Sequence, residues 1–253
     1  MKNKITTLLS NIGKLFRWIP ERQCALLLSA IAWSLSSGRK PKDGLKLLLR
    51  LNNKIYALTG RIACDYGGGL HPKHWLMQYH EFFANRIHPQ ERVIDIGCGN
   101  GALAYDIAEH SGAMVTGIEL NKQNVLEAKK RYAHNRVDYV QGDVLRDLPA
   151  GSFDVGVMSN VLEHLPDRVS FLRFAQEKLG IKRWLIRVPL YERDWRVPMM
   201  KELNLDYRLD QTHFTEYTQK SFSEEMSQAG LEIVYKETIW GEIWAEMRPS
   251  HNS

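Results

Sequence analysis

The chain has 253 residues, of which 44% are hydrophobic and 25% are charged, and these proportions are those of an ordinary globular protein. The length allows one large domain with an appendage. The three cysteines, Cys24, Cys64 and Cys98, are odd in number and far apart. We therefore expect neither a disulfide framework nor a cysteine-bound zinc site, and the cysteine usage favours a reducing, cytoplasmic setting.

The net charge of +5 is distributed unevenly along the chain. Residues 1–60 contain eleven Lys and Arg but only two Asp and Glu, a net charge of +9, which leaves −4 for the remainder. A basic segment of this kind attracts phosphate groups, either of nucleic acid or of anionic lipid.

Three helices are predicted within residues 1–60. Apolar residues recur at helical spacing over residues 5–19 and again over residues 45–58. Between them lies the apolar run Cys24–Leu35, which is too short for the roughly 20 residues that a membrane-spanning helix needs. A secretory signal peptide is the alternative for this run, although the basic stretch before it is long for one.

Two roles are open for this extension, residues 1–65. A basic amphipathic helix can lie on an anionic membrane surface, which would make this a peripheral membrane protein. The alternative is a helical cap that packs on the substrate side of the domain that follows. We do not expect nucleic acid as a partner, because aromatic side chains for base stacking are sparse here.

A glycine-rich joint over residues 65–70 precedes a single predicted helix, Trp75–Ile87, whose aromatic residues, Trp75 among them, share one apolar side. No carboxylate or cysteine at zinc-ligand spacing accompanies the histidines of this region, so we expect no metal site. These histidines are His71, His74 and His80.

From Arg92 onward, strand patterns alternate with helical patterns. Helical patterns cover residues 102–109, 121–133 and 161–179, the last interrupted at Pro166. This alternation predicts an α/β fold with a doubly wound parallel sheet. The predicted strands cover residues 93–96, 114–118, 137–141, 153–158 and 183–188.

The alternation stops after the fifth strand. Residues 189–214 have no clear period, and a long irregular segment inside a compact domain is usually a lid or a binding segment. A helix over residues 218–229 is then expected to end at Gly230. Strands over residues 231–238 and 242–247 follow, and we expect them to pair as an antiparallel hairpin at the edge of the sheet.

The stretch Val93–Gly101 predicts a buried strand followed by a glycine-rich turn, and a helix begins at Ala102. Gly97 and Gly99, with Ala102, match the dinucleotide-binding fingerprint, which alone is a weak signal. Asp95, however, stands two residues before the first glycine, where a carboxylate would repel a pyrophosphate. A ligand with a cationic or amino group suits this turn better.

Polar residues also follow the second, third and fourth strands, at the edge of the sheet where such folds bind ligands. Glu119, about 20 residues beyond the turn, can accept hydrogen bonds from both ribose hydroxyls. Asp143 can accept a hydrogen bond from a purine amine, and Asn160 completes the row. Each residue alone could be an ordinary strand-end or helix-cap residue. Together they indicate S-adenosylmethionine, which combines a ribose, a purine amine and a cationic tail.

Five motifs carry a wider resemblance: Val93–Gly101, Gly117–Leu120, Gln141–Val144, Phe153–Val155 and Ser159–Leu165. Residues 91–188 thereby resemble the class I S-adenosylmethionine-dependent methyltransferases. The branch is the one that includes ubiquinone/menaquinone-type and glycan-modifying methyltransferases. The resemblance implies a Rossmann-like methyltransferase domain over residues 66–253, with a seven-stranded, mostly parallel sheet whose last strand is antiparallel.

The resemblance also implies roles for individual residues. Glu119 would hold the ribose hydroxyls, while Leu120 would pack on the adenine. Asp143 would bind the adenine amine with Val144 beside it, and Asn160 would lie beneath the sulfonium. The cofactor-binding residues implied in this way are Asp95, Gly97, Cys98, Gly99, Asn100, Gly101, Glu119, Leu120, Asp143, Val144 and Asn160.

Methyl transfer from a sulfonium depends mainly on alignment of the acceptor, the methyl group and the sulfur. An oxygen acceptor must also lose its proton, and a base of near-neutral pKa removes it best. His164 and His213 are the candidate catalytic bases, and Asp210 or Glu216 could orient His213. Each histidine has a structural alternative: His164 as a helix-start residue bonded to the backbone, and His213 as a helix cap.

The acceptor region, residues 1–80 and 189–215, matches no acceptor motif. The fourth strand is not followed by an Asn/Asp-Pro-Pro-Tyr tetrapeptide, which argues against methylation of nucleobase amines. Residues 189–215 mix aromatic side chains with arginines, a combination that suits a sugar ring, a phosphate or an isoprenoid head group. We therefore expect O-methylation of a small-molecule, glycan or lipid-linked acceptor. An NAD-dependent oxidoreductase or epimerase, and a non-catalytic S-adenosylmethionine-binding subunit, remain as alternatives.

Overall fold

The computed structural model describes residues 18–146 and 148–250. The chain divides into two compact units: residues up to Arg61 together with Leu203–Leu205, and the remaining residues. Most of the helix expected over residues 5–19 lies outside the described residues.

The first unit contains the helix α2 (Glu21–Ser37) and most of the helix α3 (Pro41–Tyr66), so the predictions of helices over residues 24–35 and 45–58 are confirmed. Gly44 and Ser36 are buried where the two helices meet. A Cβ at Gly44 would lie 2.6 Å from the backbone oxygen of Ser36, so this corner requires glycine. Within the described residues, no helix is long and apolar enough to cross a membrane.

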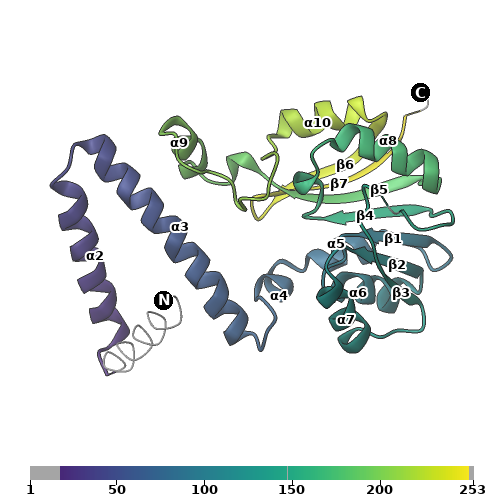
Figure 1. The fold of residues 1–253 in the computed structure, drawn as a ribbon, viewed down its shortest axis with the longest axis horizontal. Helices are drawn as coiled ribbons and strands as arrows, with labels where there is room; N and C mark the ends of the chain where they lie inside the picture. Colours follow the sequence, from purple (N-terminus) through teal and green to yellow (C-terminus); the bar gives the residue numbers. More distant parts are fainter. Residues whose placement is uncertain (1–17, 147, 251–253) are drawn as a thin grey trace. The chain divides into compact units, whose positions relative to one another are not determined.

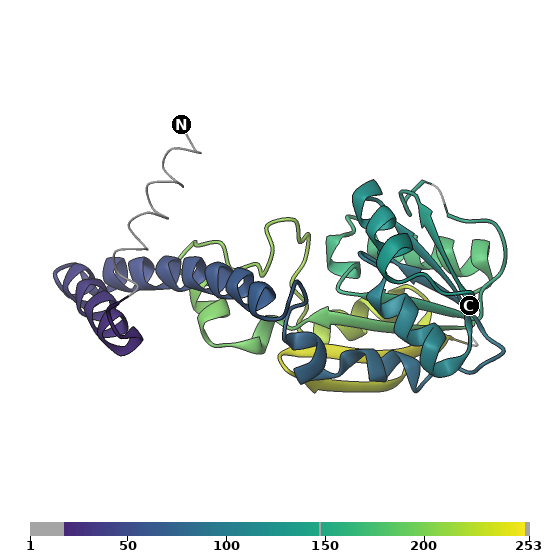
Figure 2. The ribbon, with the colours of Figure 1, turned by 90° about the horizontal axis from the view of Figure 1, so that it is seen from below.

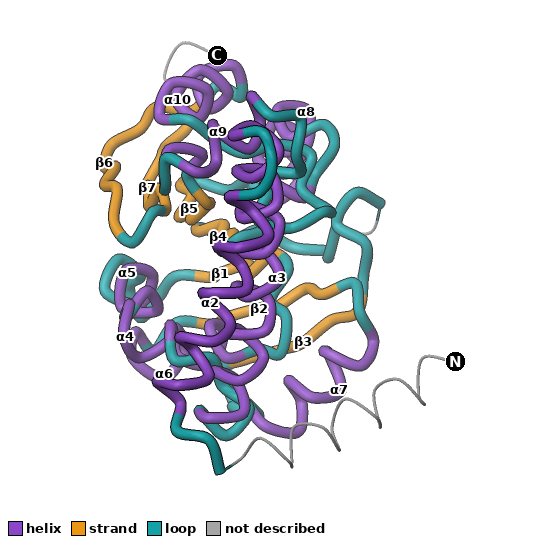
Figure 3. Tube along the Cα trace, turned by 90° about the vertical axis from the view of Figure 1, so that its left-hand side faces the viewer, coloured by secondary structure: helices purple, strands orange, loops and turns teal. Residues whose placement is uncertain are grey.

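The second unit is built on one sheet, whose strands follow the order β3-β2-β1-β4-β5-β7-β6 (Figure 3). β7 is antiparallel to both of its neighbours, and the other described pairings are parallel. The predicted doubly wound, seven-stranded sheet is therefore confirmed. The strands are β1 (Arg92–Ile96), β2 (Met114–Glu119), β3 (Val137–Gln141), β4 (Val155–Ser159), β5 (Arg183–Pro189), β6 (Leu231–Ile239) and β7 (Glu242–Pro249).

Helices cover both faces of this sheet (Figure 1). On one face lie α5 (Tyr79–Ala84), α6 (Ala102–Ser111) and α7 (Lys122–Arg131). On the other face lie α8 (Arg168–Leu179) and α10 (Gln219–Gln228). Figure 2 gives a second view of this layering, in which the yellow C-terminal strands form one margin of the sheet. The remaining short elements are α4 (Lys73–Met77), η1 (Leu162–His164), η2 (Tyr191–Arg193) and α9 (Arg196–Glu202).

The helix predicted over Trp75–Ile87 is wrong as a single element. Gln78 adopts a left-handed conformation with φ of 49°, and it separates α4 from α5. The break re-aims the chain, so that Phe82 and Phe83 are buried in the core while Trp75 stays exposed. A pattern of apolar residues does not reveal a left-handed glutamine, because glutamine rarely adopts this conformation.

The prediction that residues 189–214 are wholly irregular is also wrong, since η2 and α9 lie within them. The backbone N–H of Arg196 donates to Asp194 Oδ1 at 2.8 Å, a bond that begins α9. Val197 and Met200 are buried and anchor the helix. Two apolar residues do not establish a helical period, so the sequence does not predict this short helix.

Two apolar cores hold the sheet between its helices. Along β1, Val93 packs in one core, whereas Ile94 and Ile96 pack in the other, as alternation along a strand requires. On β4, Gly156 leaves the space that the Trp184 ring fills. A Cβ at Gly156 would lie 2.5 Å from Cε3 of Trp184, a side chain that is fully buried.

Gly156→Ala is expected to overpack this core and to lower the free energy of unfolding by about 1–3 kcal/mol, because Trp184 has no room to move. Thermal unfolding of the two proteins measures the loss. The double variant Gly156→Ala/Trp184→Phe should lose less stability than the two single variants predict by addition, because the smaller ring relieves the clash. Simple additivity would contradict this explanation.

Candidate active site

The glycine turn after β1 packs tightly at two points and opens at a third. A Cβ at Gly97 would lie 2.6 Å from Val161 Cγ2, and one at Gly101 would lie 2.7 Å from Tyr139 Cε1. A Cβ at Gly99 would meet no described atom within 4 Å. All three glycines have positive φ, so the turn needs glycine for its conformation as well as for space. The turn is therefore fixed by the protein on two sides and accessible to a ligand at Gly99.

Side chains around the turn hold it in place. The Tyr139 hydroxyl lies 3.1 Å from the backbone oxygen of Gly101 and 3.0 Å from that of Tyr132. Cys98 is buried against Gly117, and burial raises the pKa of its thiol. Asn100 Oδ1 accepts a weak hydrogen bond from Ala102 N at 3.4 Å. Cys98 thus serves packing, and its thiol is not activated as a nucleophile.

Asp95 is 1% exposed, and its Oδ2 atom has no hydrogen-bond partner among the residues that the structure describes. Burial, and next the charge of Glu119, raise the pKa of Asp95 to about 8. A buried carboxylate without a donor is costly, and a cationic or amino group would remove this cost. Asp95 therefore fits a ligand that brings its own ammonium group.

Glu119 ends β2 and points at the glycine turn. Its Oε2 accepts a hydrogen bond from Gly99 N at 3.1 Å, and its Oε1 accepts one from Asn121 N at 2.8 Å. A carboxylate that turns toward the accessible glycine can receive a pair of ligand hydroxyls. Leu120, next in the chain, leaves 67% of its surface exposed, so it is available to pack on a flat ring.

Asp143 lies at the end of β3, the outermost strand on its side of the sheet. Its Oδ1 accepts a hydrogen bond from Leu145 N at 3.1 Å, and Arg146 Nε lies 3.7 Å from its Oδ2. Val144 is partly buried and packs against the core. The structure therefore gives Asp143 a local turn-forming role, and its predicted bond to a purine amine stays a prediction.

Asn160 is held by an arginine that the sequence analysis missed. Arg187 on β5 is 2% exposed, and its Nε lies 3.3 Å from both Asn160 Oδ1 and Glu242 Oε2. The guanidinium carbon lies 3.6 Å above the ring of Tyr79. The sequence does hold a signal for Arg187, because it is an arginine between the apolar residues of a predicted buried strand. Arginine is rarely buried unless a polar group pairs with it.

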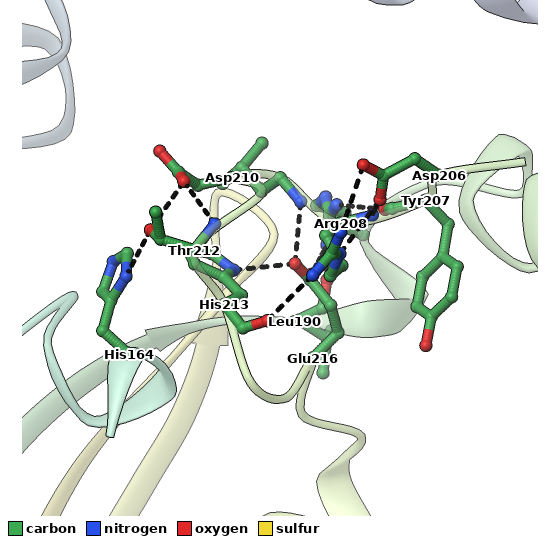
Figure 4. Close-up of polar contacts among 11 residues, drawn as sticks. His164, Leu190, Asp206, Tyr207, Arg208, Asp210, Thr212, His213 and Glu216 are labelled. Carbon is green, nitrogen blue, oxygen red and sulfur yellow. Dashed lines mark hydrogen bonds and ion pairs between the residues drawn. The ribbon is translucent and has the colours of Figure 1, made fainter. Parts of the chain in front are cut away.

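The two candidate bases lie together although they are far apart in sequence (Figure 4). The ring centroids of His164 and His213 are 4.5 Å apart in an edge-to-face arrangement. Glu163 is buried beside them, and Phe214 N donates to its backbone oxygen at 2.9 Å. We call these three residues, Glu163, His164 and His213, the histidine cluster.

Hydrogen bonds fix the tautomer of both imidazoles. The Thr212 hydroxyl donates to Asp210 Oδ1 at 2.7 Å, so it accepts from His164 Nδ1 at 2.9 Å. Glu216 Oε1 accepts from His213 Nδ1 at 2.8 Å. Nδ1 of each ring therefore carries the hydrogen, and Nε2 of each keeps its lone pair.

The helix-cap alternative for His213 is wrong, because the α10 helix is capped by Thr218, whose hydroxyl accepts from Ser221 N at 2.9 Å. His164 has a side-chain partner, the Thr212 hydroxyl, 2.9 Å from its Nδ1. Of the two acids expected to orient His213, Glu216 does so directly, whereas Asp210 acts on His164 through Thr212.

The pKa values of ionisable groups in and beside the histidine cluster are shifted. Burial raises the pKa of Glu163 to about 7, and burial followed by the charge of His213 lowers the pKa of His164. Burial alone would raise the pKa of Glu216, but its hydrogen bonds, first from His213, hold that pKa below its ordinary value. Glu216 thus stays ionised as the acceptor for His213 Nδ1, which is how a carboxylate orients a candidate base.

The N-terminal histidines have other partners. His74 Nδ1 lies 2.6 Å from the Tyr79 hydroxyl, and His80 Nδ1 lies 2.5 Å from Asp106 Oδ2. His71 Nδ1 accepts from Lys73 N at 3.1 Å. His74 and His80 line a cavity of about 430 Å³ between α4, α5 and α6.

A family model described as a methyltransferase domain matches residues 70–236, which is more than half of the chain. The chain belongs to this methyltransferase family. S-adenosylmethionine is therefore its cofactor, and the unpartnered Asp95, the open side of Gly99 and the inward Glu119 fit its amino and ribose groups. Membership in a methyltransferase family argues against the alternative of an NAD-dependent oxidoreductase or epimerase.

Relatives of this methyltransferase differ in what their names say they act on. It is 35% identical over 99 residues to the ribosomal protein L11 methyltransferase of Burkholderia thailandensis, covering 39% of this chain and 32% of the relative. It is 35% identical over 88 residues to the ubiquinone biosynthesis O-methyltransferase of Neisseria meningitidis serogroup C, covering 33% of this chain and 37% of the relative. The matches thus span about a third of the length of these curated relatives.

The fold of this methyltransferase is similar to that of solved methyltransferases. Magnesium protoporphyrin IX methyltransferase from Synechocystis PCC 6803, solved with bound SAH, aligns with a TM-score of 0.55 and 17% identity. The alignment covers 70% of this chain and 83% of that one. At this identity the similarity establishes the fold alone.

Asp95→Asn is expected to stabilise the ligand-free protein increasingly as the pH rises from about 5 to 8. The raised pKa means that the folded protein keeps a proton which the unfolded chain releases near pH 4. Wild-type stability therefore falls through this window by on the order of 1 kcal/mol per pH unit, about 3 °C in Tm, and the amide removes this slope. Thermal unfolding at several pH values measures the difference.

The exposed Asp138→Asn on β3 is the matched control for this experiment. A Tm difference between Asp95→Asn and wild type that stays constant from pH 5 to pH 8 would contradict the raised pKa of Asp95.

Proposed function

We propose that this methyltransferase transfers the methyl group of S-adenosylmethionine to an oxygen of a small-molecule, glycan or lipid-linked acceptor. The observation that carries the proposal is the histidine cluster, with two imidazoles of fixed tautomer whose Nε2 lone pairs remain available. Two members of the cluster, Glu163 and His164, come two and three residues after Val161, the residue that packs on Gly97 of the glycine turn. A hydroxyl acceptor must lose its proton on methylation, and a general base provides for this.

The chain's own groups align the reactants and remove a proton. The cofactor supplies the methyl group on a cationic sulfur. The acceptor oxygen forms the bond to the methyl carbon, the carbon–sulfur bond breaks with its electron pair left on sulfur, and the hydroxyl proton is removed at the histidine cluster. Asn160, fixed by Arg187, and the turn around Gly99 hold the reacting partners in line, which is worth several powers of ten in rate.

Side chains near the cluster support an acceptor that carries a ring or a phosphate. Tyr191 and Tyr207 lie edge to face with centroids 5.8 Å apart, and Lys201 Nζ lies 5.5 Å from each ring centroid. Trp195 is 66% exposed on the same segment. Aromatic faces beside a cation suit sugars and anionic head groups. A quinone-pathway relative that methylates oxygen by name is consistent with this choice.

The amphipathic helix α3 also bears on where the acceptor is found. Its exposed apolar residues repeat every three or four positions and form one stripe, namely Leu48, Leu51, Ile55, Leu58 and Ile62. Of its basic residues, Lys42, Lys46 and Arg50 face away from this stripe, whereas Lys54 and Arg61 flank it. We propose that α3 lies on an anionic membrane surface, since such a helix binds through both its apolar face and its charge.

The full chain, incubated with S-adenosylmethionine labelled in its methyl group and a cell-envelope extract, is expected to label a small molecule or glycan in an ether or ester linkage. His164→Ala and His213→Ala should each lower this transfer at least about 100-fold while leaving S-adenosylhomocysteine affinity unchanged, because they act on the acceptor. Mass spectrometry of the product identifies the methylated atom.

His88→Ala, an exposed histidine remote from the cluster in sequence, is the matched control and should keep full activity. Label found on protein nitrogen would overturn the oxygen proposal. Tight binding of S-adenosylhomocysteine without transfer to any extract would instead support the non-catalytic subunit.

Vesicles that contain anionic lipid are expected to retain the full chain, and retention should weaken as salt is added. The triple change Lys46→Glu, Arg50→Glu and Lys54→Glu should abolish retention, because each basic residue contributes about 1 kcal/mol near such a surface. Sedimentation with vesicles measures the effect. Charge reversal of Lys122, Lys129 and Lys130 on α7 is the control, and equal loss in both variants would count against α3.

A further inference from the structure

We propose that the histidine cluster binds a divalent cation, and that this cation holds the acceptor hydroxyl for methyl transfer. The role of the cation rests on the proposed oxygen-directed function, whereas its binding does not. The inference departs from the expectation of a metal-free protein, which considered only the histidines at positions 71, 74 and 80.

The three side chains of the cluster have the composition and the proximity of a metal site. One ligand atom from each of Glu163, His164 and His213 lies within 4.8 Å of the others. Metal–ligand bonds of about 2.1 Å place ligand atoms roughly 3 Å apart, a contraction that side-chain rotations can supply. Two imidazoles and one carboxylate form a known catalytic ligand set that leaves coordination positions open.

The groups around the two imidazoles are those expected around metal-bound histidines. A ligating imidazole almost always donates its other N–H to a carboxylate or another fixed acceptor, which sets the tautomer. His213 donates to Glu216, whose second oxygen, Oε2, lies 2.5 Å from Arg193 Nη1. His164 donates to Thr212, which is itself fixed by Asp210. Both rings are therefore held with Nε2 ready to bind an ion, as the chain of contacts in Figure 4 illustrates.

Glu163 supplies an independent observation. Its side chain is 1% exposed, and neither Oε1 nor Oε2 has a hydrogen-bond partner in the part of the chain that the structure describes. Two buried carboxylate oxygens without partners are costly, and a bound cation satisfies them. The backbone bond from Phe214 N to Glu163 O joins the two segments that carry the ligands.

The ligand set indicates which ions suit the site. The imidazoles favour Fe²⁺, Co²⁺ or Zn²⁺, and the carboxylate also admits Mn²⁺, whereas Mg²⁺ and Ca²⁺ prefer all-oxygen sites. Such a cation lowers the pKa of a coordinated hydroxyl, so the acceptor proton can pass to water while the oxygen takes the methyl group. In this arrangement the imidazoles act on the hydroxyl through the cation that their Nε2 atoms hold.

The test measures metal binding directly on the full chain, without an acceptor. Visible absorption on titration with Co²⁺, and electron paramagnetic resonance on titration with Mn²⁺, are expected to report one site per chain. Glu163→Gln, His164→Ala and His213→Ala should each weaken this binding at least about 100-fold. Thr212→Val, a change at an exposed positioning residue, should weaken it about 10–100-fold because His164 loses its fixed acceptor.

Matched controls separate metal binding from folding. His88→Ala should bind Co²⁺ as the wild type does, and every variant should keep its circular dichroism spectrum and its affinity for S-adenosylhomocysteine. A variant that fails these checks is replaced by the conservative His164→Gln or His213→Gln, for which the same loss of metal is expected.

Each outcome decides between the two proposals. Absence of Co²⁺ and Mn²⁺ binding by the wild type, or equal binding by wild type and cluster variants, overturns the metal site. Methyl transfer that withstands exhaustive chelation also overturns the role of the cation, yet it leaves the oxygen-directed function intact. Metal binding that the cluster variants lose, combined with transfer to nitrogen, keeps the site and removes the proposed function.

Discussion

The close approach of Gly97 to Val161 is the constraint on which the rest of the site depends. β1 and β4 are neighbours in the sheet and run parallel, so their carboxyl ends emerge side by side. Any side chain at the first glycine of the turn would collide with Val161 and force the two segments apart. The contact joins the turn that receives the cofactor to the short helix η1, which carries Glu163 and His164. The glycine turn and the segment that carries Glu163 and His164 are thus adjacent because Gly97 has no Cβ.

The site contains buried ionisable groups whose hydrogen bonds are not all supplied by the described residues. Asp95, Glu163 and Arg187 are all buried, and each has an atom without a hydrogen-bond partner among the described residues. Such groups lower stability when nothing binds them. The two apolar cores on either side of the sheet supply the stability that tolerates this cost. Ligands that pair with these groups would both bind and stabilise the protein, which is a common relation between binding sites and folding.

The sequence predicted the features that depend on local pattern. Strand alternation, the glycine turn after β1, the hairpin around Gly241 and the three polar strand ends could all be read from neighbouring residues. The seven strands and the antiparallel last strand agree with the resemblance. The features that were missed depend on contacts distant in sequence. His164 meets Thr212, 48 residues away, and Arg187 meets Asn160, 27 residues away. No spacing rule links such pairs, and the left-handed Gln78 follows from packing rather than from its residue type.

The position of β7 has a consequence for how the protein is made. β7 follows β6 in the chain, yet it lies between β5 and β6 in the sheet. Glu242 at its start contacts Arg187, the residue that fixes Asn160. β6 therefore has no place in the sheet until the residues of β7 have left the ribosome, and Arg187 lacks its acidic partner until then. A nascent chain that has already built the glycine turn therefore still lacks the Arg187–Glu242 contact beside Asn160.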